Sequence, residues 1–579
     1  MNDASGLEAK RPTSVPRGWC GQVGRATPHH PPVAGVDTHV RLRLALAFAL
    51  LLALAPAAQA RPNILVLETD DQTVADMVAL PKTRALIADR GTTFTNSFVS
   101  YSLCCPSRST LYTGQYAHNH GVLSNKLPTG GFTRLDTSNW LPLWLQAAGY
   151  RTMHVGKFLN GYGRDAPPTV PPGFNDWNGM VDPSTYNYFG YAVDENGVLR
   201  THPGVYSTDF ITERANELIA AASPAKQPWF MSVAWLAPHS GGPRDPDDPH
   251  GIATPSPALK YRNAFALSPL PKPASFNEAD MSDKPLALRG LKRIGPVRAA
   301  RIQEAYQQRL EALLSVDDAV ASIIAELRAV GELDNTLILF TSDNGFFHGE
   351  HRVPTGKVLV YEPSIRVPLL MRGPGVPRGL KLKQLVSNAD LSPTILAAAH
   401  ATPGRLQDGR SLLDLIRDPR VEWGRELLLE SGNPQQGLTT EGLRNYRWKY
   451  VEHSTGESEL YDLKNDPDEL TSLHADPALL GLRTALAARL HALETCAAAS
   501  CRTRPALHLK LRRRGCRLVP KVRGADAGEI DSVKFSVKRR RAAGFGRSRR
   551  ARRVLVRATV SLNDGRAVTL DKRWRVCRR

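Results

Sequence analysis

Two apolar runs, each followed directly by acidic or amide side chains, constrain the fold of this chain more than any other feature. Residues 63–67 and 335–341 are almost continuously apolar, as buried parallel strands require. The first run precedes Asp70 and Asp71, and the second precedes Asp343 and Asn344. Ligand sites of open α/β sheets lie at the carboxyl ends of parallel strands. We therefore expect these four side chains at one edge of a single sheet.

The four strand-end side chains offer the oxygen ligands that a hard cation such as calcium prefers. Asp70 and Asp71 are adjacent carboxylates, and their mutual repulsion is offset when they share such an ion. The alternative for this pair is a helix N-cap followed by a solvated aspartate.

Three basic residues follow other predicted elements of the same sheet. Lys157 ends the strand-like run 149–157, His239 follows the run 229–235, and Lys357 lies in a loop beyond Asp343. The Gly-Lys spacing at Lys157 is not that of a phosphate-binding P-loop. A lone histidine such as His239 is more often structural, but its place after a strand makes it a candidate.

Residues 297–330 show the apolar spacing of a long helix. The acidic pair Asp317 and Asp318 within this run is interpreted as a solvated face of the helix.

The segment 102–114, Ser-Leu-Cys-Cys-Pro-Ser-Arg-Ser-Thr-Leu-Tyr-Thr-Gly, predicts a short helix with a nucleophile at its start. Pro106 suits the first turn of a helix and Gly114 suits its end. Cys104 then lies where free backbone N–H groups favour an anion, and Arg108 adds a guanidinium that matches a tetrahedral oxyanion.

Two of these segments resemble signatures of the type I sulfatases, which carry formylglycine. Residues 104–108 contain the Cys-x-Pro-Ser-Arg signature, and 149–159 resemble the second signature. The resemblance covers about 61–475 and is closest to the N-acetylglucosamine-6-sulfatase and heparan 6-O-endosulfatase branch. It implies an alkaline-phosphatase-like α/β sandwich with a central, mostly parallel sheet flanked by helices. It also implies a small C-terminal antiparallel sheet subdomain.

The resemblance also implies residue roles. Cys104 is similar to the cysteine that a separate maturation enzyme oxidises to formylglycine, whose hydrate gives an alkoxide nucleophile when it loses a proton. It implies that one Ca²⁺ is held by Asp70, Asp71, Asp343, Asn344 and the modified Cys104. It further implies that Arg108 holds the hydrate, while sulfate and the leaving group are bound by Lys157, His239 and Lys357.

The chain departs from the known patterns at two positions. Arylsulfatases carry a histidine two residues after the second-signature lysine, where this chain has Leu159, which favours the glucosamine-6-sulfatase branch. That branch often has a histidine one aromatic residue after Asp-Asn-Gly. Here His348 lies one position later, and we assign it no role. Cys105 is expected to stay a thiol.

The first 60 residues are expected to be a leader. Residues 41–60 combine basic residues, an apolar run of about a dozen residues and an Ala-Gln-Ala cleavage site, as in a signal peptide. Residues 1–39 are interpreted in one of two ways. Either the start codon was assigned too early and these residues precede the true start, or they are an unusually long n-region of the signal peptide. The mature protein is then expected to be exported, secreted or associated with the cell envelope, without a transmembrane segment.

The C-terminal part is expected to form two further units. After a catalytic domain over 61–435, a C-terminal subdomain over 436–495 should contain a small antiparallel sheet and a helix over 477–493. Residues 496–579 carry 26 Lys and Arg against 5 Asp and Glu, whereas the rest of the chain carries 49 against 50. Alternating runs there predict a small β-sandwich-like module, and its arginine runs indicate contact with polyanions or merely an exposed basic surface.

Four cysteines lie in this basic module. In an exported protein they favour two disulfides, in one of three pairings, over a zinc site. The cysteines are Cys496, Cys501, Cys516 and Cys577.

Three functions follow from these observations. The leading hypothesis is a secreted, calcium-dependent sulfatase that acts on a sulfated small molecule or glycan, with 6-O-sulfated amino sugars as the candidate class. The first alternative is a phosphonate or phosphate ester hydrolase of the same superfamily. The second is an exported polyanion-binding protein whose sulfatase body is inactive.

Overall fold

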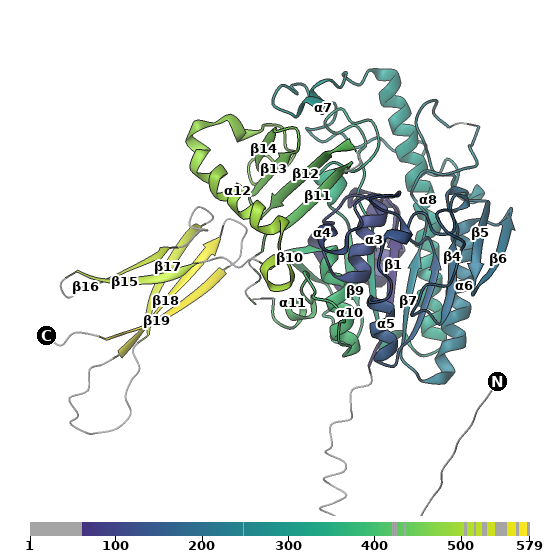
Figure 1. Cartoon of the computed structure of the whole chain (residues 1–579), viewed down its shortest axis with the longest axis horizontal. Coiled ribbons are helices and arrows are strands. Elements are labelled where there is room, and N and C mark those ends of the chain that lie inside the picture. Colours follow the sequence, from purple (N-terminus) through teal and green to yellow (C-terminus); the bar gives the residue numbers. More distant parts are fainter. Residues whose placement is uncertain are drawn as a thin grey trace, which may run out of the picture. The chain divides into compact units, whose positions relative to one another are not determined.

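A computed structural model of the chain shows an α/β body followed by a series of antiparallel sheets (Figure 1). It describes residues 61–575 except 247, 420, 422, 424, 434–435, 503–506, 515–516, 524–529, 539–552 and 563–566. The expected signal peptide therefore lies outside the described residues, as do Cys516 and Cys577. Within the described part, no helix is both long and apolar enough to cross a membrane.

The body is built on a ten-stranded sheet in the order β10-β2-β9-β8-β1-β7-β3-β4-β5-β6. Its centre, from β8 to β4, is parallel throughout, as the apolar runs predicted. The flanking strands β9, β5 and β6 run antiparallel to their neighbours. The strands are β1 (Asn63–Thr69), β2 (Thr92–Phe98), β3 (Arg151–Gly156), β4 (Asp176–Met180), β5 (Gly190–Glu195), β6 (Val198–Pro203), β7 (Trp229–Ala234), β8 (Thr336–Ser342), β9 (Leu369–Arg372) and β10 (Leu380–Ser387).

Helices cover both faces of this sheet. The longest is α8 (Pro296–Ala329), which confirms the helix predicted over 297–330. The segment 102–114, for which a short helix was predicted, forms α3 (Cys104–Thr113), and Gly114 ends this helix with a positive φ of 69°. The other α-helices are α2 (Pro81–Thr83), α4 (Ala117–His120), α5 (Leu141–Ala147), α6 (Ser207–Ala222), α7 (Leu286–Arg289), α9 (Glu362–Ile365), α10 (Leu391–Ala399), α11 (Leu413–Arg417) and α12 (Leu480–Glu494).

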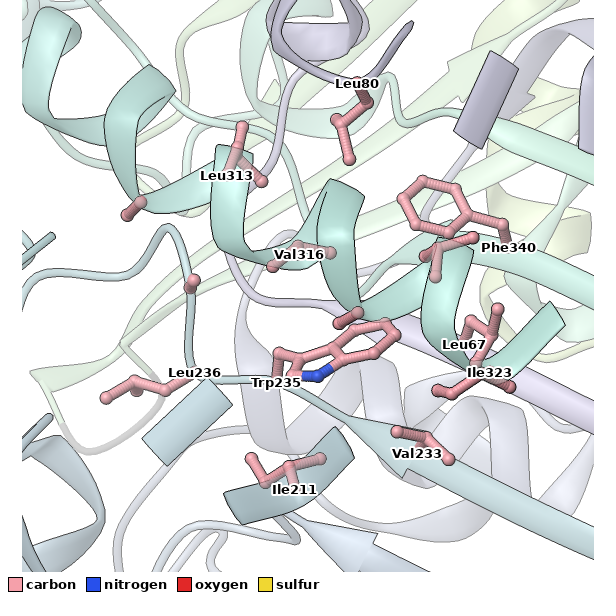
Figure 2. Close-up of a cluster of buried hydrophobic side chains, with 14 of the residues drawn as sticks. Leu67, Leu80, Ile211, Val233, Trp235, Leu236, Leu313, Val316, Ile323 and Phe340 are labelled. Carbon is pink, nitrogen blue, oxygen red and sulfur yellow. The ribbon is translucent and has the colours of Figure 1, made fainter. Parts of the chain in front are cut away.

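Strand β1 contributes to two hydrophobic cores, one on each face of the sheet. Leu65 and Leu67 pack into a cluster with α6 and α8, whereas Ile64 and Val66 pack into another with α3, α5 and α10. Figure 2 shows part of the first cluster, with Trp235 among Val316, Ile323 and Val233. Because successive side chains of a strand point to opposite faces, a continuous apolar run is what a two-sided core demands.

Asp317 corrects the expectation of a solvated acidic face on this helix. Its carboxylate is buried and accepts hydrogen bonds from the backbone N–H groups of Lys82 and Thr83, at 2.9 and 2.7 Å. It thereby satisfies donors of the short helix α2, which has no capping side chain of its own. Asp318 is partly exposed and pairs with Lys260 at 3.0 Å.

The C-terminal subdomain contains a four-stranded antiparallel sheet in the order β11-β12-β13-β14. The sheet begins at residue 427, before the run from which it was predicted. Asp476 accepts a hydrogen bond from the backbone N–H of Ala478 at 2.8 Å and caps the turn that leads into α12. The strands are β11 (Leu427–Asn433), β12 (Leu438–Arg444), β13 (Trp448–His453) and β14 (Ser458–Asp462).

The basic segment forms a two-stranded and a three-stranded antiparallel sheet, which share an apolar cluster. Cys496 and Cys501 form a disulfide, so one of the two expected bridges is present. Residues 563–566, which connect the paired strands β18 and β19, lie outside the described residues. The strands are β15 (His508–Arg514), β16 (Arg517–Arg523), β17 (Ile530–Lys538), β18 (Arg553–Leu562) and β19 (Ala567–Arg575).

Candidate active site

The parallel pairing of β1 with β8 brings the four strand-end side chains together. Thr69 lies beside Ser342 in the sheet, so the next two residues of each strand emerge at the same edge. Asn344 donates its side-chain N–H to Asp71 Oδ1 at 2.6 Å, and the backbone N–H of Asp71 donates to Asp343 Oδ1 at 3.1 Å. The four side chains thus lie at one edge of the sheet, as the strand-end pattern predicted, and all four are buried.

Cys104 lies at the start of α3, against this acidic group. Its Sγ is 3.6 Å from Asp70 Oδ1 and 2.8 Å from Lys357 Nζ. Burial, reinforced by the charge of Asp70, raises the pKa of the Cys104 thiol to about 12 despite the two nearby lysines. The side chain is therefore a neutral thiol at physiological pH, and a neutral thiol is a poor nucleophile.

Cys105 is buried as well, but it contacts a different part of the molecule. Its backbone N–H donates to Asn125 Oδ1 at 2.9 Å, and its side chain belongs to the hydrophobic cluster beneath α3. Burial raises the pKa of this thiol to about 12 too. The two adjacent cysteines are thus both buried and both have a raised thiol pKa, but they contact different residues.

Arg108 joins the start of α3 to both strand ends. Its Nε donates to Asp343 Oδ2 at 2.9 Å and its Nη1 lies 2.9 Å from Glu68 Oε2. Burial raises the pKa of the Glu68 carboxyl, against the attraction of Arg108, to about 7. Among the described residues, Nη2 of Arg108 has no hydrogen-bond acceptor although it is buried.

Two lysines contact the paired aspartates. Lys157 forms an ion pair with Asp70 and lies 4.9 Å above the ring of Tyr186, and Lys357 forms an ion pair with Asp71. Burial opposes their positive charge, but the carboxylates outweigh it, and the pKa of each lysine is raised. Both side chains therefore remain cationic in the site.

His239 completes the edge from the loop after β7. Its Nδ1 lies 2.6 Å from the carbonyl oxygen of Ser240, which can only accept, so Nδ1 carries the proton. Nε2 is then the free nitrogen, 3.7 Å from Asp71 Oδ2. Burial lowers the pKa of the imidazole below its usual value, in spite of Asp70 and Asp71.

The donor set fits a hard divalent cation. The oxygens of Asp70 and Asp71, Cys104 Sγ and a nitrogen of His239 lie within 4.8 Å of one another. Within the described part of the chain, Oδ1 of Asn344 is a buried acceptor without a donor. Four carboxylates and three cations contact one another here, and a bound Ca²⁺ would offset the repulsion between the carboxylates and occupy that acceptor. The four carboxylates are Glu68, Asp70, Asp71 and Asp343, and the cations are Arg108, Lys157 and Lys357.

Arg309 is a part of the site that sequence reasoning missed. This buried residue of α8 donates through Nη2 to the backbone carbonyl of Asp71 and through Nη1 to that of Pro238 at 2.9 Å. Asp71 has a positive φ of 69°, which is unfavourable for an aspartate. Arg309 thus holds both Asp71, whose backbone is in the left-handed region, and the turn before His239. An arginine within a helical pattern gives no sequence signal for such a contact.

His348, to which no role was assigned, does not join this group. Its ring packs against Tyr306 and Phe346, with centroids 5.2 and 5.4 Å apart. Burial, with the nearby charge of Arg309, lowers the pKa of its imidazole well below the usual value.

Comparisons with known proteins cover most of the chain. Residues 62–401 match the family model described as "Sulfatase", and residues 349–496 match "N-sulphoglucosamine sulphohydrolase, C-terminal". An arylsulfatase of Volvox carteri is 34% identical over 77% of this chain and 76% of its own length. The human N-acetylglucosamine-6-sulfatase is 32% identical over 83% of this chain and 92% of its own length.

A solved structure shares the fold. It is described as BT4656 in complex with D-glucosamine-2-N,6-O-disulfate, with a TM-score of 0.63 and 23% identity over 74% of this chain and 97% of that one.

Proposed function

Because the chain belongs to the sulfatase family and is a sulfuric ester hydrolase, we propose that it removes 6-O-sulfate from amino sugars after Cys104 becomes formylglycine. The substrate class is supported by the human relative, which is named for this specificity, and by Leu159, where an arylsulfatase-type histidine is missing. The observation that carries the proposal is the surroundings of Cys104. They combine the acidic donor set, two lysines and an arginine around a thiol that is not ionised.

Oxygen donors at the strand ends would hold one Ca²⁺. The residues are Asp70, Asp71, Asp343 and Asn344, together with the modified residue 104. The bound ion would supply positive charge beside the nucleophile and the sulfate group. A formylglycine hydrate would supply an oxygen nucleophile and return to the aldehyde when sulfate departs.

The remaining charged groups suit an anionic substrate. Arg108 offers its Nη2, which lies 3.7 Å from Asp70 Oδ2 and has no hydrogen-bond acceptor among the described residues, and Lys157 and Lys357 remain cationic because of the carboxylates beside them. Fixed positive groups of this kind stabilise the charge that spreads over equatorial oxygens during sulfuryl transfer, as in phosphoryl transfer. His239 is assigned to the leaving alcohol, because its Nδ1–H is held by Ser240 and its Nε2 would take up a proton and pass it to the departing alkoxide.

The organic part of the substrate is proposed to enter a neighbouring cavity of about 870 Å³. Leu103 and Val358 line it and are direct chain neighbours of Cys104 and Lys357. Leu286 and Leu438, both exposed, contribute apolar walls. A Leu438→Trp variant should raise KM for a sulfated oligosaccharide and leave KM for p-nitrophenyl sulfate unchanged. Equal effects on both substrates would reject this cavity as the binding site.

The decisive experiment examines Cys104 and Cys105 together. Mass spectrometry of their peptide, from protein made in its native host, should find formylglycine at 104 and an unmodified thiol at 105. Cys104→Ala should lower kcat for a 6-O-sulfated amino sugar by at least about 1,000-fold. Cys105→Ala is the matched control and should retain activity. An unmodified Cys104 in active native enzyme would refute the formylglycine proposal.

The rival phosphonate or phosphate ester hydrolase uses the same nucleophile and metal. Relative rates on p-nitrophenyl sulfate and p-nitrophenyl phenylphosphonate separate the two, and we expect the sulfate ester to be the better substrate. The proposal of an inactive polyanion-binding protein would be favoured by native protein that retains a cysteine at 104 and hydrolyses neither ester.

Export and polyanion binding complete the proposal. The signal-like run 41–60 and the disulfide between Cys496 and Cys501 both suit an oxidising compartment outside the cytosol. The basic residues of 496–579 are proposed to contact polyanions such as the sulfated glycan itself. Conversion of Cys104 would require a formylglycine-generating enzyme as a transient partner.

A further inference from the structure

A hollow of about 500 Å³, distinct from the catalytic centre, is lined by four arginines and one carboxylate. The apolar residues that line it include Leu333, which is buried, and Leu86. The charged residues that line it are Arg90, Arg328, Arg372, Arg378 and Asp334. They come from the loop before β2, the end of α8, the end of β9, the loop after β9 and the turn before β8.

The hollow lies at the edge of the sheet opposite the catalytic centre. Arg372 is paired with Ile338 near the start of β8, whereas Asp343 follows the end of that strand. Seven residues of β8 separate the two edges by about 20 Å. This distance exceeds the Debye length of about 8 Å at physiological ionic strength. Salt therefore largely screens the exposed arginines from the charges at the other edge of the sheet.

The positive charge in the hollow is not balanced by the protein. Among the described residues, none of the four guanidinium groups has a carboxylate within ion-pair distance, and Asp334 is the one acidic lining residue. Arg372 is held in place by its Nη1, which donates to the carbonyl oxygen of Leu86 at 2.7 Å. Burial and the three neighbouring arginines lower the pKa of Arg372, although Asp334 opposes this. The fold thus keeps four like charges close together.

Helix electrostatics accounts for two of these arginines and not for the other two. Arg328 lies in the last turn of α8, and Arg90 follows Asp89, the C-cap of the short helix Arg84–Ala88, so both complement the negative end of a helix dipole. Arg372 ends β9 and Arg378 lies in the loop after it, so neither receives such stabilisation. Because guanidinium groups form paired hydrogen bonds to tetrahedral oxyanions, a bound anion would relieve their repulsion and use their donors.

We propose that this arginine hollow is a second anion site, which binds a sulfate-type oxyanion away from the catalytic centre. The oxyanion is either free inorganic sulfate or a sulfate group carried by an oligosaccharide. Both sources present the same three or four oxygens to the guanidinium groups. The site is independent of hydrolysis, so its existence does not depend on the function proposed above.

Arginine footprinting with phenylglyoxal tests this site in the full-length protein. Peptide mass spectrometry follows the modification rates of Arg90 and Arg378, which are exposed, with and without sodium sulfate at constant ionic strength. Arg200 on β6 and Arg417 at the end of α11 are internal controls, since both are exposed and each is already paired with a carboxylate, of Glu195 and Asp414. At ten times Kd, sulfate should slow modification of Arg90 and Arg378 about tenfold and leave the controls unchanged.

A second arm replaces sulfate by a heparin-derived hexasaccharide, to separate the two sources of the oxyanion. Stronger protection by the hexasaccharide at equal sulfate-group concentration assigns the site to a glycan, and equal protection assigns it to free sulfate. Arg90→Gln/Arg378→Gln should abolish the protection that remains at Arg328, whereas Arg200→Gln/Arg417→Gln should not. Unchanged rates at Arg90 and Arg378, or equal protection of Arg200 and Arg417, would overturn the proposal.

Discussion

Arg309 is a buried cation whose hydrogen bonds go to backbone carbonyl groups beside the site. It donates no hydrogen bond to the site carboxylates among the described residues. Its two donors hold the carbonyl groups of Asp71 and Pro238, so a single side chain fixes two segments that carry site residues. It also lies 4.1 Å above the ring of Phe346, which keeps the guanidinium in place. We therefore regard Arg309 as a positioning residue.

Arg309→Met should weaken Ca²⁺ binding and lower kcat/KM by about 10- to 100-fold, because groups that orient ligands have effects of this size. Gln307→Met is the matched control. Gln307 is buried on the same helix but donates to the carbonyl groups of Ala266 and Ser268, away from the site. Calorimetric titration with Ca²⁺ measures the first effect. Equal Ca²⁺ affinities of the two variants would show that Arg309 only stabilises the helix.

The buried imidazole of His154 should make the stability of the protein depend on pH. Burial, with a smaller contribution from Arg108, lowers the pKa of its imidazole to about 3 in the folded protein, from 6.5 when exposed. Between these values the unfolded chain binds one more proton than the folded chain. Its contribution to stability is therefore complete above pH 6.5 and is lost as the pH falls towards 3.

Replacement of His154 by Phe should make stability less dependent on pH. Each pH unit between 6.5 and 3 costs the wild type about 1.4 kcal/mol through this group. In denaturant unfolding at pH 7 and pH 5, the free energy of unfolding of the variant should fall less with decreasing pH than that of the wild type. Phenylalanine should keep the ring stack on Trp177, whose centroid is 4.7 Å from that of His154. His400→Asn changes an exposed histidine and should leave the slope as it is. An unchanged slope in His154→Phe would contradict this account.

At the scale of elements, the ends of β1 and β8 concentrate acidic groups that a cation should stabilise. Calcium that binds only the folded state adds about 2.7 kcal/mol at 100 times Kd. Chelation with EGTA should therefore lower the thermal midpoint of the wild type. Asp343→Asn should abolish this response, because its carboxylate belongs to the proposed ligand set.

Asp317→Asn provides the control for this prediction. Asp317 is a buried carboxylate as well, but it accepts hydrogen bonds from the start of α2. Its replacement should cost about 1 kcal/mol, as for the loss of a helix cap, and leave the midpoint sensitive to EGTA. If Asp343→Asn kept the full calcium response, the ion would have to bind elsewhere.

The whole molecule combines a nearly neutral body with a strongly basic C-terminal segment. The segment has an apolar cluster of its own, formed by Leu507, Leu509, Leu511 and residues of β18. Cys496 belongs instead to the cluster of α12 and the four-stranded sheet, and its carbonyl oxygen accepts from Asn119 at 2.9 Å. We propose that the basic module begins after the disulfide.

A chain that ends at Arg502 should keep the catalytic body intact. Its thermal midpoint should change by less than about 2 °C, and its rate on p-nitrophenyl sulfate should match that of the full chain. Its retention on a heparin column should fall, because residues 496–579 carry most of the excess positive charge. Loss of activity on truncation would show that the basic module is part of the catalytic unit.

The sequence by itself determined the α/β fold and the strand ends that carry the site. Runs such as 63–67 are apolar because both faces of β1 are covered, and acidic residues directly after a strand have only one edge to occupy. The sulfatase resemblance then singled out Cys104 and its neighbours. These features are local in the chain, so they leave a pattern that can be read along it.

Only the tertiary structure decided which charges meet. Arg309 and Asp317 lie eight residues apart on α8, and each follows the same helical pattern, yet one holds Asp71 and the other caps α2. Likewise, Arg90, Arg328 and Arg372 are far apart in sequence and converge on one hollow. Contacts between distant segments depend on how helices and strands pack, and polar residues within a helix show no period that reveals their partners.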